Sequence, residues 1–277
     1  MPELPEAEVV ARQLRHRLVG AHLKDCWVGR PDIVRQGLDQ LDWYRGARIA
    51  GVERYGKTVV LALVQESREP ETRFLAAELG MTGLLLFRTP HPGYQKHTHL
   101  ILTLTDCPEP ELRYWNPRRF GRIWLLDQTR LHGFLARRFG WDPLRGNRED
   151  FFRMVKARRG RIKALLLHQQ RVAGIGNIYA NEILYRARIH PHAKGSRLSR
   201  PAILRLYEAM RGVLEEAIAH GGSTIRDFLA PDGTAGRFQE RHRVYNRAGQ
   251  PCQICGTGFR RLVTERSSFY CPRCQVR

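Results

Sequence analysis

Apolar positions near the start of the chain recur at helical spacing. Ala7, Val10, Leu14 and Leu18 lie three or four residues apart, behind a start that contains proline and glutamate. Short apolar runs follow at residues 58–63, 84–87, 100–104 and 122–126, separated by Gly, Pro and Asp. Short strands joined by loops predict an antiparallel β-sandwich or barrel behind an N-terminal helix.

From about residue 131 the apolar spacing becomes helical. Helical runs are predicted near Phe134, Asp150, Ile162 and Ile178, and Ser199 is a suitable N-cap for a further helix. The two helices that flank the polar connection at 190–199 resemble a helix–two-turns–helix unit. Residues 221–236 are rich in Gly, Ser, Thr and Asp, which predicts a mobile loop.

The charge balance indicates a polyanionic partner. The 277 residues carry 47 Lys and Arg against 27 Asp and Glu, a net charge of +20. Most of the basic residues are arginine, whose planar guanidinium suits bidentate phosphate contacts, so we expect salt-dependent binding to nucleic acid. Codon usage could explain arginine over lysine, but not the shortage of acidic residues. No segment is long and apolar enough to span a membrane, and the acidic start is not a secretion signal, so we expect a soluble intracellular protein.

Four of the six cysteines form two CxxC pairs near the end of the chain. Cys252 and Cys255 are separated by 15 residues from Cys271 and Cys274, which is the spacing of a closed four-thiolate zinc site. Disulfides or a redox CxxC fit a basic intracellular chain poorly. Arg260, Arg261 and Arg266 lie between the pairs, so the zinc is expected to fix a basic hairpin against nucleic acid. Cys26 and Cys107 are expected to be packing residues.

These patterns together predict an α+β multidomain protein. The expected domains are a β-sandwich at 1–130, a helix–two-turns–helix domain at 131–241 and a zinc hairpin at 242–277.

The first residues, Met1 to Glu6, admit two interpretations. If Met1 is removed, Pro2 presents a secondary amine that is partly neutral at pH 7 and can attack an aldehyde-like carbon to give an iminium. Glu3 and Glu6 lie within a turn of that amine and could move protons. The alternative is that proline and glutamate only begin the helix.

Several loops carry candidate nucleic-acid contacts. Arg118 and Phe120 lie on a loop between strands and suit a wedge into a base stack, as does Met81 between glycines. Each could equally be a surface turn or core filler. Lys57 and His97 could bind phosphates, and the glycines before Asn177 could form an anion site at a helix start; solvated lysine, satisfied imidazole and helix–turn packing are the simpler alternatives.

The chain as a whole resembles the formamidopyrimidine-DNA glycosylases, which repair oxidised purines. The resemblance runs almost end to end and rests on the four cysteines and on PELPE at 2–6, LGMTG at 79–83, KHTH at 96–99, PRRFG at 117–121, GIGNIY at 174–179 and GGSTIRDF at 221–228.

The resemblance implies a role for each matching residue. Pro2 would form the Schiff base with C1′, Glu3 would be the main proton donor, and Glu6 would support the amine. Lys57 would bind a phosphate and assist β-elimination, and Arg266 would contact the phosphate for δ-elimination. The gap left in the base stack would be filled by Met81, Arg118 and Phe120. The DNA phosphates would be held by His97, Arg158, Lys163 and Asn177. The loop 221–239 would close over the everted base.

Three positions depart from the family pattern. Asn116 stands where Asp is expected, Asn181 where Asp or Ser is usual, and the cysteine pairs are one residue closer than usual. Two alternatives remain: a sister enzyme for oxidised pyrimidines, and a catalytically silent zinc protein that binds damaged DNA. The expected enzyme is a cytoplasmic, bacterial, monomeric glycosylase and lyase that holds one structural zinc ion and acts on damaged double-stranded DNA.

Overall fold

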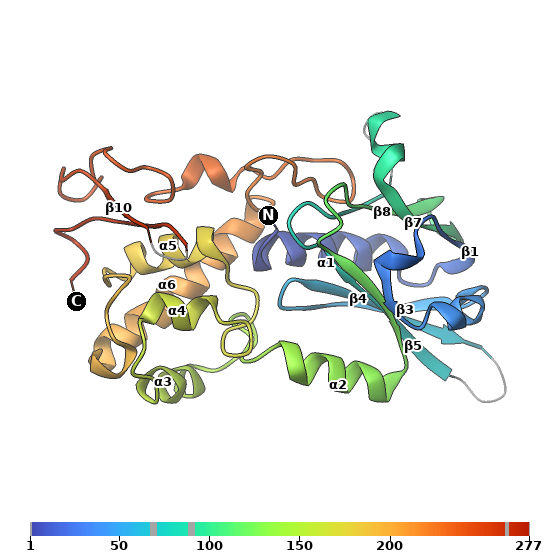
Figure 1. Ribbon diagram of the computed structural model, residues 1–277, viewed down its shortest axis with the longest axis horizontal. Coiled ribbons are helices and arrows are strands. Elements are labelled where there is room, and N and C mark those ends of the chain that lie inside the picture. The colour runs from blue at the N-terminus through green and yellow to red at the C-terminus, as the bar shows by residue number, and fades with distance from the viewer. Residues whose placement is uncertain (1, 67–70, 88–91, 264–265, 277) are drawn as a thin grey trace. The chain divides into compact units, whose positions relative to one another are not determined.

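The protein divides into two compact units, which are described separately. The computed structural model describes residues 2–66, 71–87, 92–263 and 266–276 (Figure 1). One unit comprises Met1–Arg137 with His220–Gln239, and the other Arg138–Ala219 with Glu240–Arg277. The loop after the long helix therefore belongs to the first unit, although it follows the helical segment in sequence. The three-domain division by chain order stays a prediction.

Within its described residues, the first unit is built on a nine-stranded sheet in the order β2-β9-β5-β4-β3-β1-β7-β8-β6. All neighbours are antiparallel except β2 and β9. The pairing of β1 with β3 is short: it centres on His22 and Arg48, with backbone hydrogen bonds between Ala21 and Ile49 and between Leu23 and Ala47 on either side. The strands are β1 (His22–Val28), β2 (Val34–Gln36), β3 (Arg48–Tyr55), β4 (Thr58–Gln65), β5 (Glu71–Glu78), β6 (Leu84–Leu86), β7 (Thr98–Thr105), β8 (Glu111–Trp115) and β9 (Arg122–Leu126).

Helix α1 (Leu4–Leu18) supplies one side of the core of this unit. Its buried stripe includes Val10, Leu14 and Leu18, as the sequence predicted. The helix packs on β3 and β4, and one apolar cluster joins it to residues from the sheet, such as Leu23 and Leu61. The N-terminal helix and the antiparallel sheet folded around a common core confirm the predicted fold class of this part.

The second unit contains the helical segment. The 20-residue helix α6 (Arg200–Ala219) packs against α3 (Arg148–Lys156) and α5 (Asn177–Arg186), and α4 (Ile162–Leu167) packs on α5. Helix α2 (Gln128–Arg138) belongs to the first unit up to Arg137. It begins earlier than the run predicted near Phe134, because Asp127 accepts the backbone N–H of Arg130 and starts the first turn. Helix α5 spans Asn177–Arg186, where a helical run was predicted near Ile178.

The C-terminal segment of the second unit is a small hairpin. Strand β10 (Arg260–Leu262) pairs with β11 (Ser268–Tyr270) in antiparallel register, Arg261 opposite Phe269. Its aromatic residues Phe259 and Phe269 join Tyr185 of α5 and two of the cysteines in a separate apolar cluster. In the described part of the chain, no helix combines the length and apolarity needed to cross a membrane.

Candidate active site, DNA-contacting residues and zinc centre

The two acidic residues at the start of α1 form a reciprocal cap. Glu6 Oε2 accepts the backbone N–H of Glu3 at 2.8 Å, and the two side chains complete a capping box. Both are only 1 % exposed, and Pro2 beside them is buried. The hydrogen bonds therefore agree with the interpretation that proline and glutamate begin the helix. The same geometry buries both carboxylates in the first helical turn after Pro2, and the catalytic interpretation stays a prediction.

Glu6 also holds a segment distant in sequence. Its Oε1 accepts the backbone N–H of Ser223 at 2.7 Å. The preceding Gly222 has a positive φ of +79°, and a Cβ there would lie 2.7 Å from Glu6 Oε1. The loop closes on itself nearby, where Gly222 O accepts the N–H of Phe238 at 2.9 Å. The base of the loop 221–239 is thus anchored to a carboxylate beside Pro2.

The residues predicted to act as wedges come from two loops that pack together. Met81 and Phe120 are 38 % and 54 % exposed, although both are large and apolar. The guanidinium of Arg118 lies 4.8 Å from the Phe120 ring centroid. A Cβ on Gly80 would come within 2.4 Å of Gly121 N, so the two loops touch through their glycines. The structure thus packs the loop that carries Met81 against the loop that carries Arg118 and Phe120.

Asn116 and Tyr114 support these loops from below. Asn116 is fully buried and donates from Nδ2 to Tyr114 Oη at 2.9 Å and to Gly121 O at 3.3 Å. Tyr114 Oη in turn donates to Glu78 O at 2.7 Å. An aspartate would lack the Nδ2 donor, so the departure from the family pattern at Asn116 has a structural use here.

The residues assigned to phosphates differ in exposure. Arg158 is exposed, while His97 and Lys57 are half-buried, and Asn177 is half-buried as the first residue of α5. Lys163 is only 5 % exposed, and its Nζ donates to Ser267 O and Ser268 Oγ, both at 2.8 Å. Lys163 therefore tethers α4 to the hairpin, and its phosphate contact stays a prediction. His99 is buried, with Nε2 3.0 Å from Asn116 O, which agrees with the satisfied imidazole.

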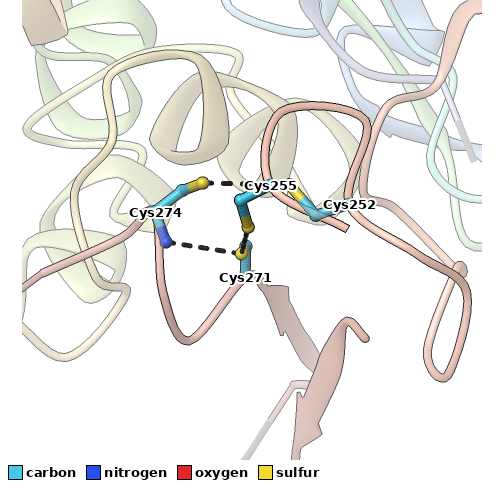
Figure 2. A group of neighbouring side chains, drawn as sticks. All are labelled: Cys252, Cys255, Cys271 and Cys274. Carbon is cyan, nitrogen blue, oxygen red and sulfur yellow. Dashed lines mark hydrogen bonds between the residues drawn. The ribbon is translucent and has the colours of Figure 1, made fainter. Parts of the chain in front are cut away.

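The four cysteines converge on one point, as Figure 2 shows. Their Sγ atoms all lie within 4.8 Å of one another, with 3.9 Å between Cys252 and Cys274 and 3.5 Å between Cys255 and Cys271. A tetrahedron of thiolates about 2.3 Å from zinc has edges of about 3.8 Å, so the donor set fits one zinc ion and leaves no open position. All four are free thiols rather than disulfides.

Hydrogen bonds lower the pKa of two of the four thiols, Cys252 and Cys255. Thr257 holds the pKa of Cys255 down to about 6, through its hydroxyl and its backbone N–H. The hydroxyl of Tyr185 lies 3.3 Å from Cys252 Sγ, and the N–H of Cys274 points at Cys271 Sγ at 3.4 Å. Such contacts orient metal ligands and neutralise part of their charge.

Two buried residues of α5, which sequence reasoning did not select as site residues, attach this zinc segment. Asn181 Oδ1 accepts the N–H of Phe269 at 2.7 Å. Glu182, 3 % exposed, accepts the N–H groups of Arg243, Val244 and Tyr245 at 2.8 to 3.0 Å. Burial raises the pKa of Glu182, against the effect of these donors. In the sequence, these two polar residues interrupt an otherwise largely apolar run of α5, and that interruption could have marked them as buried polar contacts.

Arg266 lies on the connection between β10 and β11 and is exposed. Its neighbours at 264–265 are outside the described residues. The hairpin thus carries an exposed arginine at this position, and its contact with phosphate stays a prediction.

A β unit that begins with a proline-led helix, a helical unit and a four-thiolate finger together define the class of zinc-finger DNA glycosylases. Three family models match in order: the formamidopyrimidine-DNA glycosylase N-terminal domain at 1–123, its H2TH domain at 139–229, and the zinc finger found in FPG and IleRS at 249–276. The chain belongs to the formamidopyrimidine-DNA glycosylase family, a family with glycosylase and AP-lyase activity.

Relatives and solved structures agree over the whole length. The chain is 43 % identical to the formamidopyrimidine-DNA glycosylase of Novosphingobium aromaticivorans (99 % of this chain, 100 % of the relative) and 41 % to that of Solibacter usitatus (100 % of each). The MutM (Fpg) protein of Thermus thermophilus matches with a TM-score of 0.83 at 39 % identity, over 99 % and 98 % of the two chains. A Lactococcus lactis Fpg mutant in complex with Fapy-dG containing DNA gives 0.85 at 31 % identity, over 100 % of each.

Proposed function

We propose that this protein removes oxidised purines, 8-oxoguanine and formamidopyrimidines, from duplex DNA and then nicks the strand. The observation that carries the proposal is the pair of buried, reciprocally capped carboxylates, Glu3 and Glu6, in the helical turn that follows Pro2. Family membership supports the reaction class, and the Lactococcus lactis relatives were crystallised with Fapy-dG containing DNA and with abasic-site DNA.

The chemistry requires a free amine on Pro2, and therefore removal of Met1. The Pro2 nitrogen attacks C1′ of the flipped nucleotide, the bond between C1′ and the base breaks, and the base leaves with a proton. Ring opening of the sugar gives an iminium between Pro2 and C1′. Glu3 is the proposed proton donor: its side chain accepts the backbone N–H of Glu6 in the capping box, whereas Glu6 is engaged by the backbone N–H groups of both Glu3 and Ser223.

The iminium then acts as an electron sink for strand cleavage. Loss of a C2′ proton expels the 3′-phosphate as the C3′–O bond breaks (β-elimination), and a second proton loss expels the 5′-phosphate (δ-elimination). Lys57 and Arg266 are the proposed phosphate contacts for these steps. Hydrolysis of the remaining iminium returns the Pro2 amine.

The DNA would be bent at the lesion, because C1′ is inaccessible inside a stacked duplex. Met81, Arg118 and Phe120 would enter the gap, with Arg118 on the opposite base. His97, Arg158, Lys163 and Asn177 would hold the backbone, and the loop 221–239 would cover the everted base. The +20 net charge is consistent with many such phosphate contacts. We further propose that the enzyme acts as a monomer in the bacterial cytoplasm.

Borohydride trapping on an abasic duplex tests the mechanism. A sample whose mass shows removal of Met1 is expected to form a covalent adduct at Pro2. A short N-terminal extension converts the amine into an amide and should abolish trapping, whereas the same extension at the C-terminus should not. Absence of the adduct in the processed sample would favour a silent binder of damaged DNA.

Substrate competition tests the lesion class. Duplexes with 8-oxoguanine and with thymine glycol, mixed in equal amounts, should be cleaved with preference for the purine lesion. Preference for thymine glycol would instead assign the protein to the oxidised-pyrimidine enzymes.

A further inference from the structure

Arg54 is a charged residue in the interior of the β unit. It lies on β3, is 1 % exposed, and is among the largest fully buried side chains of the protein. Its Nε donates to Glu8 Oε2 at 2.7 Å. Glu8 lies on α1, two residues after Glu6. One arm of the guanidinium therefore holds the helix that begins beside Pro2.

The other arm of Arg54 holds a turn. Its Nη1 donates to Gly56 O at 3.1 Å. Gly56 has a positive φ of +57°, in the tight connection between β3 and β4. Tyr55 and Thr58 pair across that connection, so Lys57 stands directly at its tip. A single buried side chain thus joins the start of α1 to the residue proposed to contact the phosphate.

Stability alone does not explain a buried charge pair. An ion pair in the interior loses hydration, and a pair of apolar side chains of similar volume is often as stable or more so. Burial pushes the pKa of Glu8 upward, but hydrogen bonds from Arg54 and from Arg12 outweigh it and leave that pKa below its ordinary value. Glu8 is thus held ionised, and the planar guanidinium can bridge two elements at fixed geometry.

We propose that Arg54 is a positioning residue that sets Lys57 relative to the helix carrying Pro2 and Glu3. Arg54 touches neither substrate nor reacting atoms and acts through the Gly56 carbonyl. The inference rests on the proposed function, because it assumes that Lys57 contacts the phosphate during β-elimination.

The test separates positioning from folding. Arg54→Met alone removes the buried partner of Glu8, leaves the exposed Arg12 as its remaining ion-pair partner, and should unfold at a lower temperature. The double variant Arg54→Met/Glu8→Gln removes both charges and should regain most of that stability. We expect the double variant to release 8-oxoguanine within a few-fold of the wild-type single-turnover rate, but to cleave the strand about 10- to 100-fold more slowly, because a small misplacement of a catalytic group has costs of this size.

Arg12→Met is the matched control. Arg12 also donates to Glu8, at 2.8 Å, but its side chain is 58 % exposed and it makes no bond to the turn. This variant should keep the wild-type ratio of strand cleavage to base release. Lys57→Met added to the double variant should cause little further loss, since the two changes act through one group.

The outcomes are distinct. A double variant that is stable and keeps the wild-type ratio of cleavage to base release would overturn the positioning role and leave a purely structural pair. Additive losses for Lys57→Met and the double variant would overturn the route through Lys57. Failure of the wild-type protein to be trapped on abasic DNA would instead overturn the proposed function.

Discussion

Asn181 on α5 accepts the backbone N–H of Phe269 on β11 at 2.7 Å, across 88 residues of sequence. Its Nδ2 donates to Asn177 O at 2.6 Å. One buried amide therefore connects the first turn of α5, where Asn177 is proposed to bind phosphate, with the hairpin that carries Arg266. Lys163 reaches the two preceding hairpin residues, Ser267 and Ser268. The hairpin is thus held by side chains as well as by its metal.

Replacing Asn181 should loosen the hairpin in a graded way. Asn181→Leu removes both bonds and leaves the Phe269 N–H buried, which should cost about 1–3 kcal/mol of unfolding free energy. Asn181→Asp keeps an acceptor for Phe269 but loses the donor to Asn177 and buries a carboxyl group, so it should lie between Leu and wild type only while that carboxyl is protonated. Urea unfolding and the rate of zinc transfer to a chelator measure both effects. Equal behaviour of the Leu and Asp variants would show that the Phe269 bond is unimportant.

Loss of the metal should affect DNA binding more than the β unit. Cys271→Ala removes one of four thiolates, and structural zinc contributes directly to the folding of small metal-bound segments. We expect the affinity for an abasic duplex to fall. The near-UV circular dichroism spectrum, which reports the packing of aromatic side chains, should be largely retained because the β unit stays folded. Treatment of the wild-type protein with a chelator should reproduce the change. Unchanged affinity in the Cys271→Ala variant and in the chelator-treated protein would count against a contact between Arg266 and DNA.

Stability should decrease on mild acidification because of His242. This imidazole is 9 % exposed, and burial lowers its pKa to about 4, against an ordinary value near 6.5. Between these values the unfolded chain binds the proton and the folded chain does not, so stability falls as pH drops from about 6.5 toward 4. At about 1.36 kcal/mol for each pKa unit, the loss approaches about 3 kcal/mol.

The matched variant for this prediction is His242→Phe, which keeps an aromatic ring beside Tyr245. Its unfolding free energy should change less between pH 7 and pH 5 than that of the wild type. Zinc content is measured at each pH, so that thiolate protonation is not mistaken for the imidazole. An equal slope for both proteins would assign the acid sensitivity to other groups.

Local patterns predicted much of the fold. The strand at 58–63 and the helix at 7–18 were visible because their apolar residues are continuous or evenly spaced, and they lie in β4 and α1. Strand β3 was missed because its outward positions are polar and its inward positions include the charged Arg54. The spacing of the four cysteines is visible in the sequence, so the zinc site could be predicted without the structure.

Bonds between segments distant in sequence could not be predicted in the same way. Asn181 meets a partner on β11, and Glu6 meets Ser223 across 217 residues. Nothing in the residues around Glu6 distinguishes a helix cap from a carboxylate that also holds a loop. The two interpretations of the first residues therefore proved compatible, since the cap fixes the carboxylates beside Pro2.

The contact of Glu6 with the loop gives a final prediction. Gly222→Ala places a Cβ 2.7 Å from Glu6 Oε1, in addition to the strain of an alanine at φ +79°. Gly233→Ala is the matched control, because it lies in the same loop at φ +86° with nothing within 4 Å of its Cβ. Both variants should lose about 1–2 kcal/mol of unfolding free energy from backbone strain.

Only Gly222→Ala should slow the release of 8-oxoguanine, since it displaces the carboxylate that holds the Glu3 amide beside Pro2. Single-turnover base release at saturating enzyme measures this difference without interference from DNA binding. A loss of about tenfold or more in Gly222→Ala, with Gly233→Ala near wild type, would support the coupling of the loop to the helix start. Equal rates in the two variants would show that the loop anchor and the chemistry at Pro2 are independent.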